Sequence, residues 1–182
     1  MLRERVLTVR TMGLTSGGAW HRSSEIAHRY RLTMTPAELQ QLLVTHLPDV
    51  PGIATADVWP QRPYGLTVTL AGSGANVHWM VTGASGVAPA AGDDRLAPPA
   101  LPDLTTSPTQ LADVELALLA TLARSTEGVV RADRYSTRAQ PPAVVFGATV
   151  DCTDGWRLFL SAVGTSARAG DRLRPVTAGA TA

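Results

Sequence analysis

Hydrophobic and polar residues alternate along six short stretches of the chain. In the first half these lie at about 53–59, 65–71 and 77–82, and in the second half at about 129–135, 143–151 and 156–163. Successive side chains of a β-strand point to opposite sides, so alternation is typical of strands with one buried face. Glycine and Asx residues at 72–76 and 152–155 lie between neighbouring stretches, where hairpin loops need them. The pattern predicts two sets of three strands.

A stretch with the hydrophobic spacing of an amphipathic helix precedes each set of three predicted strands. The first helix is predicted to begin at Thr35-Pro36-Ala37-Glu38, where a threonine N-cap, a proline at the first helical position and a glutamate that can bond back to the cap occur together. Its continuation, ELQQLLVTHL, places four leucines close to one face, and Pro48 ends it. The second helix is predicted to start with the same cap pattern at Ser107 and to continue through the apolar stripe of LADVELALLATLAR.

Similar residues recur at a nearly constant spacing in the two halves. GIATADVWPQR at 52–62 matches GVVRADRYSTR at 128–138 at an offset of 76. Downstream, the strands match at offsets of 80 and then 81, whereas the caps Thr35 and Ser107 are 72 apart. A second helix that is four residues longer, about one turn, would explain the smaller cap spacing. We prefer internal duplication to chance similarity of two amphipathic segments.

The expected fold class is α+β. Two αβββ halves from internal duplication would form one antiparallel sheet of about six strands, with both helices on one face. The predicted organisation is a basic, flexible leader at 1–33, a first half at 34–83, a Pro/Ala/Gly-rich linker at 84–107, a second half at 108–164 and a flexible tail at 165–182.

The amino-acid composition indicates the kind of genome that encodes the chain and the cellular compartment expected for it. All sixteen basic residues are arginine, alongside abundant alanine, glycine and proline, which suggests a GC-rich bacterial genome. The single cysteine, Cys152, cannot form an internal disulfide, so a reducing cytoplasm is expected. No apolar run reaches the eighteen or so residues of a membrane span, so we expect no membrane association.

Positive charge is concentrated in the leader. Six arginines lie there against two acids, whereas the remaining chain carries ten arginines and thirteen acids. One interpretation is a nucleic-acid-binding arm, made of Arg3, Arg5, Arg10, Arg22, Arg29 and Arg31. The preferred one is that Met34, directly before the helix start, is the natural start and that residues 1–33 are an upstream read-through. The acidic balance of the remaining chain argues against nucleic acid.

The repeated stretch also supplies a candidate interaction face. Strand alternation puts an aspartate and an aromatic residue on the outer face of each half, with arginines nearby. The candidate residues are Trp59, Tyr135, Arg62, Arg131, Arg138, Asp57 and Asp133. Exposed, they could stack bases or bind a peptide. The structural alternative, which we favour, is that Asp57–Arg62 and Asp133–Arg138 are ion pairs shielded by the aromatic rings.

Catalytic signals are weak. No carboxylate or cysteine lies at ligand spacing from His46 or His78, and no base is placed to activate Cys152 in its predicted loop. We therefore expect no enzyme activity, metal or cofactor; an enzyme would need a pocket lined by His78, Asp57 or Asp133. The leading hypothesis is a non-enzymatic cytoplasmic interaction or assembly module that binds a protein partner or itself through a sheet face or free sheet edges. The alternative is a nucleic-acid-binding accessory protein.

Overall fold

The structure, a computed structural model, describes residues 34–87, 107–125, 128–139, 143–168 and 171–176. Its elements are α1 (Pro36–His46), the 3₁₀ turn η1 (Leu47–Asp49), β1 (Ile53–Trp59), β2 (Gly65–Leu70), β3 (Asn76–Ala84), α2 (Leu111–Ser125), β4 (Val129–Arg134), β5 (Gly147–Cys152), β6 (Arg157–Ser166) and β7 (Arg174–Pro175). A helix followed by three strands thus occurs twice. The predicted leader, 1–33, and residues 88–106 of the predicted linker lie outside the described residues.

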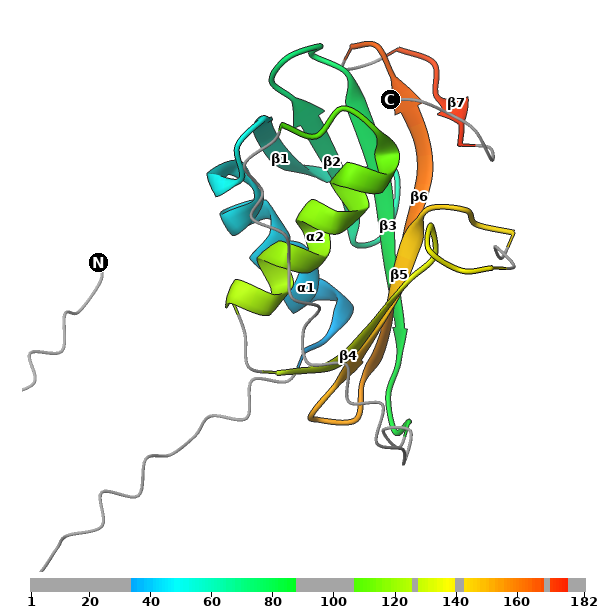
Figure 1. Ribbon diagram of the computed structural model, residues 1–182. Helices are drawn as coiled ribbons and strands as arrows, with labels where there is room; N and C mark the ends of the chain where they lie inside the picture. Colours follow the sequence, from blue (N-terminus) through cyan, green and yellow to red (C-terminus); the bar gives the residue numbers. More distant parts are fainter. Residues whose placement is uncertain (1–33, 88–106, 126–127, 140–142, 169–170, 177–182) are drawn as a thin grey trace, which may run out of the picture. The chain divides into compact units, whose positions relative to one another are not determined.

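All strand pairs belong to one antiparallel sheet with the order β1-β2-β3-β6-β5-β4. Both helices lie on the same side of this sheet (Figure 1). The predicted α+β class is therefore confirmed. The part of the chain that the structure describes forms seven strands rather than about six, because β7 pairs with the end of β6 that extends beyond β5. In this order the third strands of the two halves meet at the centre, and the first strands, β1 and β4, form the two ends.

The first helix begins as predicted. The Thr35 hydroxyl accepts a hydrogen bond from the Glu38 N–H at 3.3 Å, and the Glu38 carboxylate accepts one from the Thr35 N–H at 2.7 Å. These two reciprocal bonds form a capping box, and Pro36 occupies the first turn. At the other end Pro48 lies in η1, where the chain tightens into a 3₁₀ turn.

The predicted start of the second helix was wrong. The helix begins at Leu111, and the Asp113 carboxylate accepts hydrogen bonds from the N–H groups of Thr109 and Gln110. Ser107 instead packs on a turn: a Cβ added to Gly52, whose φ is +86°, would lie 2.4 Å from the Ser107 Cβ. Helix α2 has 15 residues and α1 has 11, as expected, but the extra turn is at the C-terminal end, where α1 gives way to η1.

In the second strand of each half, the pairing of residues differs by two positions from the match made by sequence similarity. Asp57 of β1 pairs with Thr67, and Asp133 of β4 pairs with Thr149. The second strands therefore correspond at an offset of 82 rather than 80, which preserves the side chains' faces because the shift is even. The register also shifts at the same place in both edge strands, between Ile53 and Thr55 and between Val129 and Arg131.

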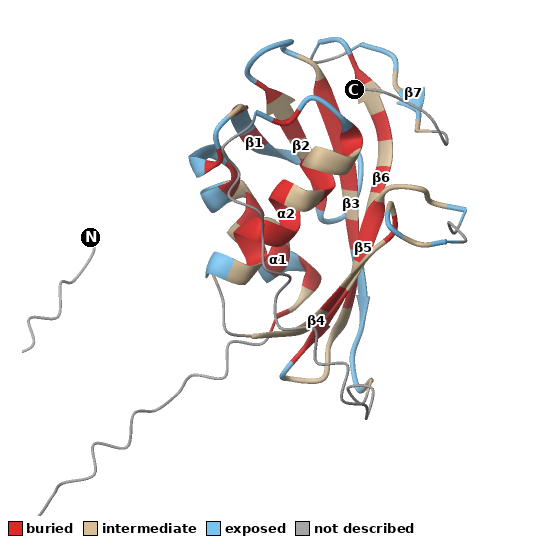
Figure 2. Cartoon of the chain, viewed as in Figure 1, coloured by how far each residue is buried: buried red, intermediate tan, exposed pale blue. Residues whose placement is uncertain are grey.

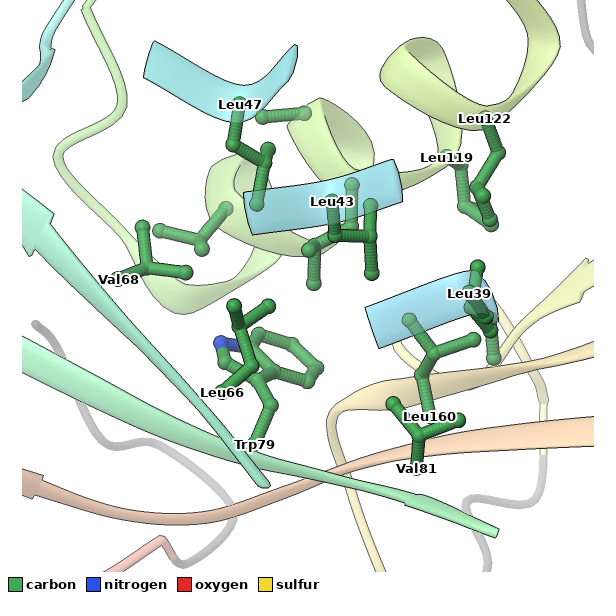
Figure 3. Packing of buried hydrophobic residues seen from close by; sticks show 14 of the residues in the cluster. Leu39, Leu43, Leu47, Leu66, Val68, Trp79, Val81, Leu119, Leu122 and Leu160 are labelled. Atoms are coloured by element: carbon green, nitrogen blue, oxygen red, sulfur yellow. The ribbon is translucent and has the colours of Figure 1, made fainter. Parts of the chain in front are cut away.

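The hydrophobic core lies between the helices and the sheet (Figure 2). Figure 3 shows leucines of α1 pointing toward Trp79 of β3, whose side chain is fully buried. Strand side chains that face the helices alternate with polar ones on the opposite side, which we call the outer face. The core members from the central strands are Val77, Trp79, Val81, Leu158, Leu160 and Ala162.

Two segments predicted as linker and tail contribute strands. Ala84, the first residue of the predicted linker, belongs to β3 and pairs with Arg157 of β6. Thr165 and Ser166 complete β6, and Arg174–Pro175 forms β7. Gly164 permits this last pairing, since a Cβ there would lie 2.9 Å from the Arg174 carbonyl oxygen. The ordered sheet is therefore longer at its centre than the sequence indicated.

Candidate interaction site

The sequence-predicted aspartates and aromatic rings lie on the outer face in both halves, as strand alternation requires. Their exposure differs from the expectation. Trp59 is 5% exposed and Tyr135 is 7% exposed. Buried rings cannot stack on a nucleic-acid base without first being uncovered, so the two aromatic residues do not form an open stacking platform.

In the second half the repeated stretch forms a compact ion pair. The Arg138 Nη2 donates to the Asp133 carboxylate at 2.5 Å, and the guanidinium lies 4.4 Å from the centre of the Tyr135 ring. The hydrogen bond that Arg138 donates to Asp133 raises the pKa of Arg138, so this arginine stays charged at any physiological pH. Tyr135 is held in turn by a 3.0 Å hydrogen bond between its hydroxyl and that of Thr149. Here the structural alternative described the geometry correctly.

The first half does not form the equivalent ion pair. Asp57 accepts a hydrogen bond from the Thr55 hydroxyl at 2.8 Å, and among the described residues it has no ion pair with Arg62. Trp59 packs against the His78 imidazole, with 5.0 Å between ring centres. The expected Asp57–Arg62 pair is thus wrong, and the two similar stretches have different side-chain contacts.

Charged side chains of β4, β5 and β6 surround a hollow of about 290 Å³ on the outer face. Arg157 donates two hydrogen bonds to Asp151, at 2.5 and 3.1 Å. Arg131 also lines the hollow, but it has no hydrogen-bond or ion-pair partner among the described residues. The hollow is lined by Arg131, Asp133, Arg138, Thr149, Asp151, Arg157 and Phe159. Within the described ranges, the hollow therefore combines two satisfied ion pairs with one cation, Arg131, whose side chain is unpaired.

A buried carboxylate that sequence reasoning missed organises the same region. Glu115 of α2 is 1% exposed. Its Oε1 accepts hydrogen bonds from the backbone N–H groups of Tyr135, Ser136 and Gly147, at 3.2, 3.2 and 2.8 Å. The Arg134 Nε donates to its other oxygen at 3.0 Å, as does the Ser136 hydroxyl. A charged residue within the apolar stripe of the second helix was the available signal. Glu115 fixes where β4 ends and β5 begins.

The free edges of the sheet are the second candidate surface. Within the described ranges no strand pairs with the outer side of β1 or of β4. Val58 of β1 is 53% exposed, which makes it one of the two large exposed hydrophobic residues among those described. Unpaired edge strands present rows of N–H and C=O groups that can accept another strand.

His78 lies at the junction of the halves, away from the charged hollow. Its ring nitrogens contact the Thr67 hydroxyl at 3.1 Å and the Ser166 hydroxyl at 3.0 Å. Burial lowers the pKa of His78, which favours the neutral ring. Neither contact is to a carboxylate, and both partners are neutral. Within the ranges described, no three His, Cys, Asp or Glu side chains are close enough together to hold a metal ion.

Cys152 was expected in a loop but is the last residue of β5 and is 1% exposed. Burial raises the pKa of its thiol to about 12, and the nearby Asp154 and Asp151 act in the same direction. The six leader arginines, Arg3 to Arg31, lie outside the described residues. None of the described helices has the length and apolar character needed to cross a membrane.

Comparisons of the chain with models of known protein families, with curated proteins and with solved structures gave no match. Function therefore has to be inferred from the chain's own surfaces.

Proposed function

We propose that this chain is a non-enzymatic cytoplasmic interaction or assembly module that binds a protein through the free edges of its sheet. The observation that carries the proposal is the strand order, which leaves β1 and β4 without an outer neighbour among the described residues. Strand addition to such an edge supplies main-chain hydrogen bonds, and side chains beside the edge select the partner. A buried, reduced Cys152 is compatible with a reducing compartment.

Internal duplication is part of this proposal. Each half contains a backbone hydrogen bond at the corresponding position. The Ala71 N–H donates to the Gly52 carbonyl, and the Thr153 N–H donates to the Gly128 carbonyl. The register shifts in β1 and β4 also occur at matching positions. A duplicated unit whose third strands join at the centre must place its first strands at the two ends. Duplication would therefore account for the two free edges.

The nucleic-acid alternative receives less support from the described residues. Arg138 and Arg157 on the outer face are each bound to an aspartate, so their charge is neutralised locally. Phosphate contacts supply most non-specific affinity for nucleic acid and need available cations. The proposed protein partner requires no such excess of positive charge.

A site-specific photocrosslinker tests the proposal, because the chain has no lysine for amine-reactive reagents. A photoreactive residue would replace Val58 of β1 or Val130 of β4, with exposed Gln41 of α1 as the matched control. We expect one defined protein adduct in cells from an edge position and none from Gln41. Equal, diffuse labelling from all three positions would contradict edge binding.

A further inference from the structure

Some backbone N–H and C=O groups of β4 point away from β5, toward the free edge of the sheet. The Tyr135 N–H donates to the Gly147 carbonyl of β5 at 2.9 Å. Along a strand, successive residues direct their N–H and C=O groups to opposite edges. The groups of Asp133 and Arg131 therefore point toward β5 with those of Tyr135, whereas the groups of Ala132 point to the free edge. Ala132 is thus placed to exchange two hydrogen bonds with an antiparallel strand.

The side chains beside Ala132 have opposite charges. Arg131 and Asp133 both lie on the outer face. Arg131 has no partner among the described residues, and Asp133 uses only its Oδ2 to bind Arg138. A second strand with a cation opposite Asp133 and an anion opposite Arg131 would pair both. When an antiparallel copy of β4 is centred on Ala132, Arg131 faces Asp133 of the copy and Asp133 faces Arg131 of the copy.

We propose that the partner is a second copy of this chain, bound edge to edge through β4 about a two-fold axis at Ala132. This inference rests on the proposed function, of which it names the partner and the register. The Ala132 residues exchange both main-chain hydrogen bonds, and two symmetric Arg131–Asp133 pairs lie on the outer face. The two sheets become one continuous sheet. Such an interface is isologous and closes at two copies.

The other edge lacks this complementarity. In a two-fold pairing of β1 centred on Ala56, Thr55 would face Asp57 of the copy, and no opposite charges would meet. Pairing of β1 with β4 of the next copy would be heterologous and would continue into open chains. Discrete dimers therefore distinguish pairing through β4 from β1–β4 chains.

Two charge reversals test the register. Arg131→Asp places two aspartates opposite two aspartates, and Asp133→Arg places two arginines opposite two arginines. We expect each variant alone to raise the dimer dissociation constant at least about tenfold in sedimentation equilibrium, since like charges directly opposite repel. An equimolar mixture of the two variants restores opposite charges at both positions and should form a heterodimer. Arg62→Asp, an exposed reversal away from β4, is the control and should dimerise like the wild type.

Circular dichroism of each variant establishes that it is folded, because Asp133→Arg also removes the partner of Arg138. If this variant unfolds, Arg131→Asp mixed with Asp133→Asn provides the second measurement: the mixture should dimerise more tightly than Arg131→Asp alone. Dimers that persist in both single reversals would refute the register. A wild-type chain that stays monomeric at the highest soluble concentration would refute self-pairing. Specific edge crosslinks to a different protein would then still support the proposed function, whereas their absence as well would remove both.

Discussion

Removal of the Glu115 carboxylate should destabilise the fold more than any surface substitution. In Glu115→Ala, the N–H groups of Ser136 and Gly147 lose this acceptor, and the Tyr135 N–H keeps its bond to the Gly147 carbonyl. Arg134, whose side chain is 21% exposed, loses its counter-ion. Breaking a buried, hydrogen-bonded ion pair by removing one partner costs about 3–5 kcal/mol. In Glu115→Gln, Oε1 can still accept the three backbone bonds, so we expect a smaller loss of about 1–3 kcal/mol, from Arg134 and Ser136.

Urea unfolding followed by tryptophan fluorescence measures both variants. With a slope of about 2 kcal/mol per molar urea, Glu115→Ala should lower the midpoint by about 1.5–2.5 M. The matched control is Asp49→Asn, which changes an 81% exposed carboxylate whose side chain lies 3.8 Å from the His46 imidazole. Its effect should stay within about 0.5 kcal/mol. A midpoint for Glu115→Ala within about 0.3 M of wild type would refute the role of Glu115 as the acceptor that fixes the β4–β5 connection.

Three further predictions concern buried groups. Cys152 should be inert to a thiol reagent at pH 8 and react on unfolding. Because its pKa of about 12 in the folded chain exceeds the ordinary value of 9.0, the free energy of unfolding should fall as the pH rises above about 9, a slope that Cys152→Ala would lack. Fast labelling of the folded chain would contradict its burial. Since burial lowers the pKa of His78 below 6.5, the unfolded state binds more protons in acid, and urea midpoints should fall below about pH 6.5, less so in His78→Asn; an equal fall in both would exclude His78 as the cause. Gly147→Ala should cost about 1–3 kcal/mol, because its Cβ would lie 2.2 Å from the Leu160 carbonyl oxygen, whereas Gly72→Ala meets no atom within 4 Å and should be nearly neutral in thermal unfolding.

Local signals predicted the elements well. The period-two pattern placed β1 at Ile53–Trp59, and the cap residues placed the start of α1, because each depends on neighbours in sequence. The second cap pattern misled because Ser107 meets a competing tertiary contact at Gly52. β7 was missed because two residues carry no periodic signal, and their pairing depends on the length of β6.

The candidate site was predicted only in part. Sequence spacing brought Asp133 and Arg138 together correctly, since both lie within one strand and its following turn. It could not show that Trp59 reaches across the sheet to His78, nor that the Arg131 side chain has no partner among the described residues, because both depend on neighbouring strands. Glu115 corresponds to the buried Leu39 at the repeat offset of 76, so one position in the two halves carries leucine in one and a carboxylate in the other. Only the three-dimensional structure shows the donors around that carboxylate.

The central place of β6 has a consequence for synthesis. β6 pairs with β3, and their partners are separated by between 73 and 90 residues of chain, from Ala84–Arg157 to Asn76–Ser166. During translation, β1, β2 and β3 are complete long before β6 leaves the ribosome, and the inner edge of β3 has no partner during that interval. An unpaired edge can capture another nascent chain. The risk of misassembly should therefore be greatest at the future centre of the sheet, and faster translation of the second half should reduce it.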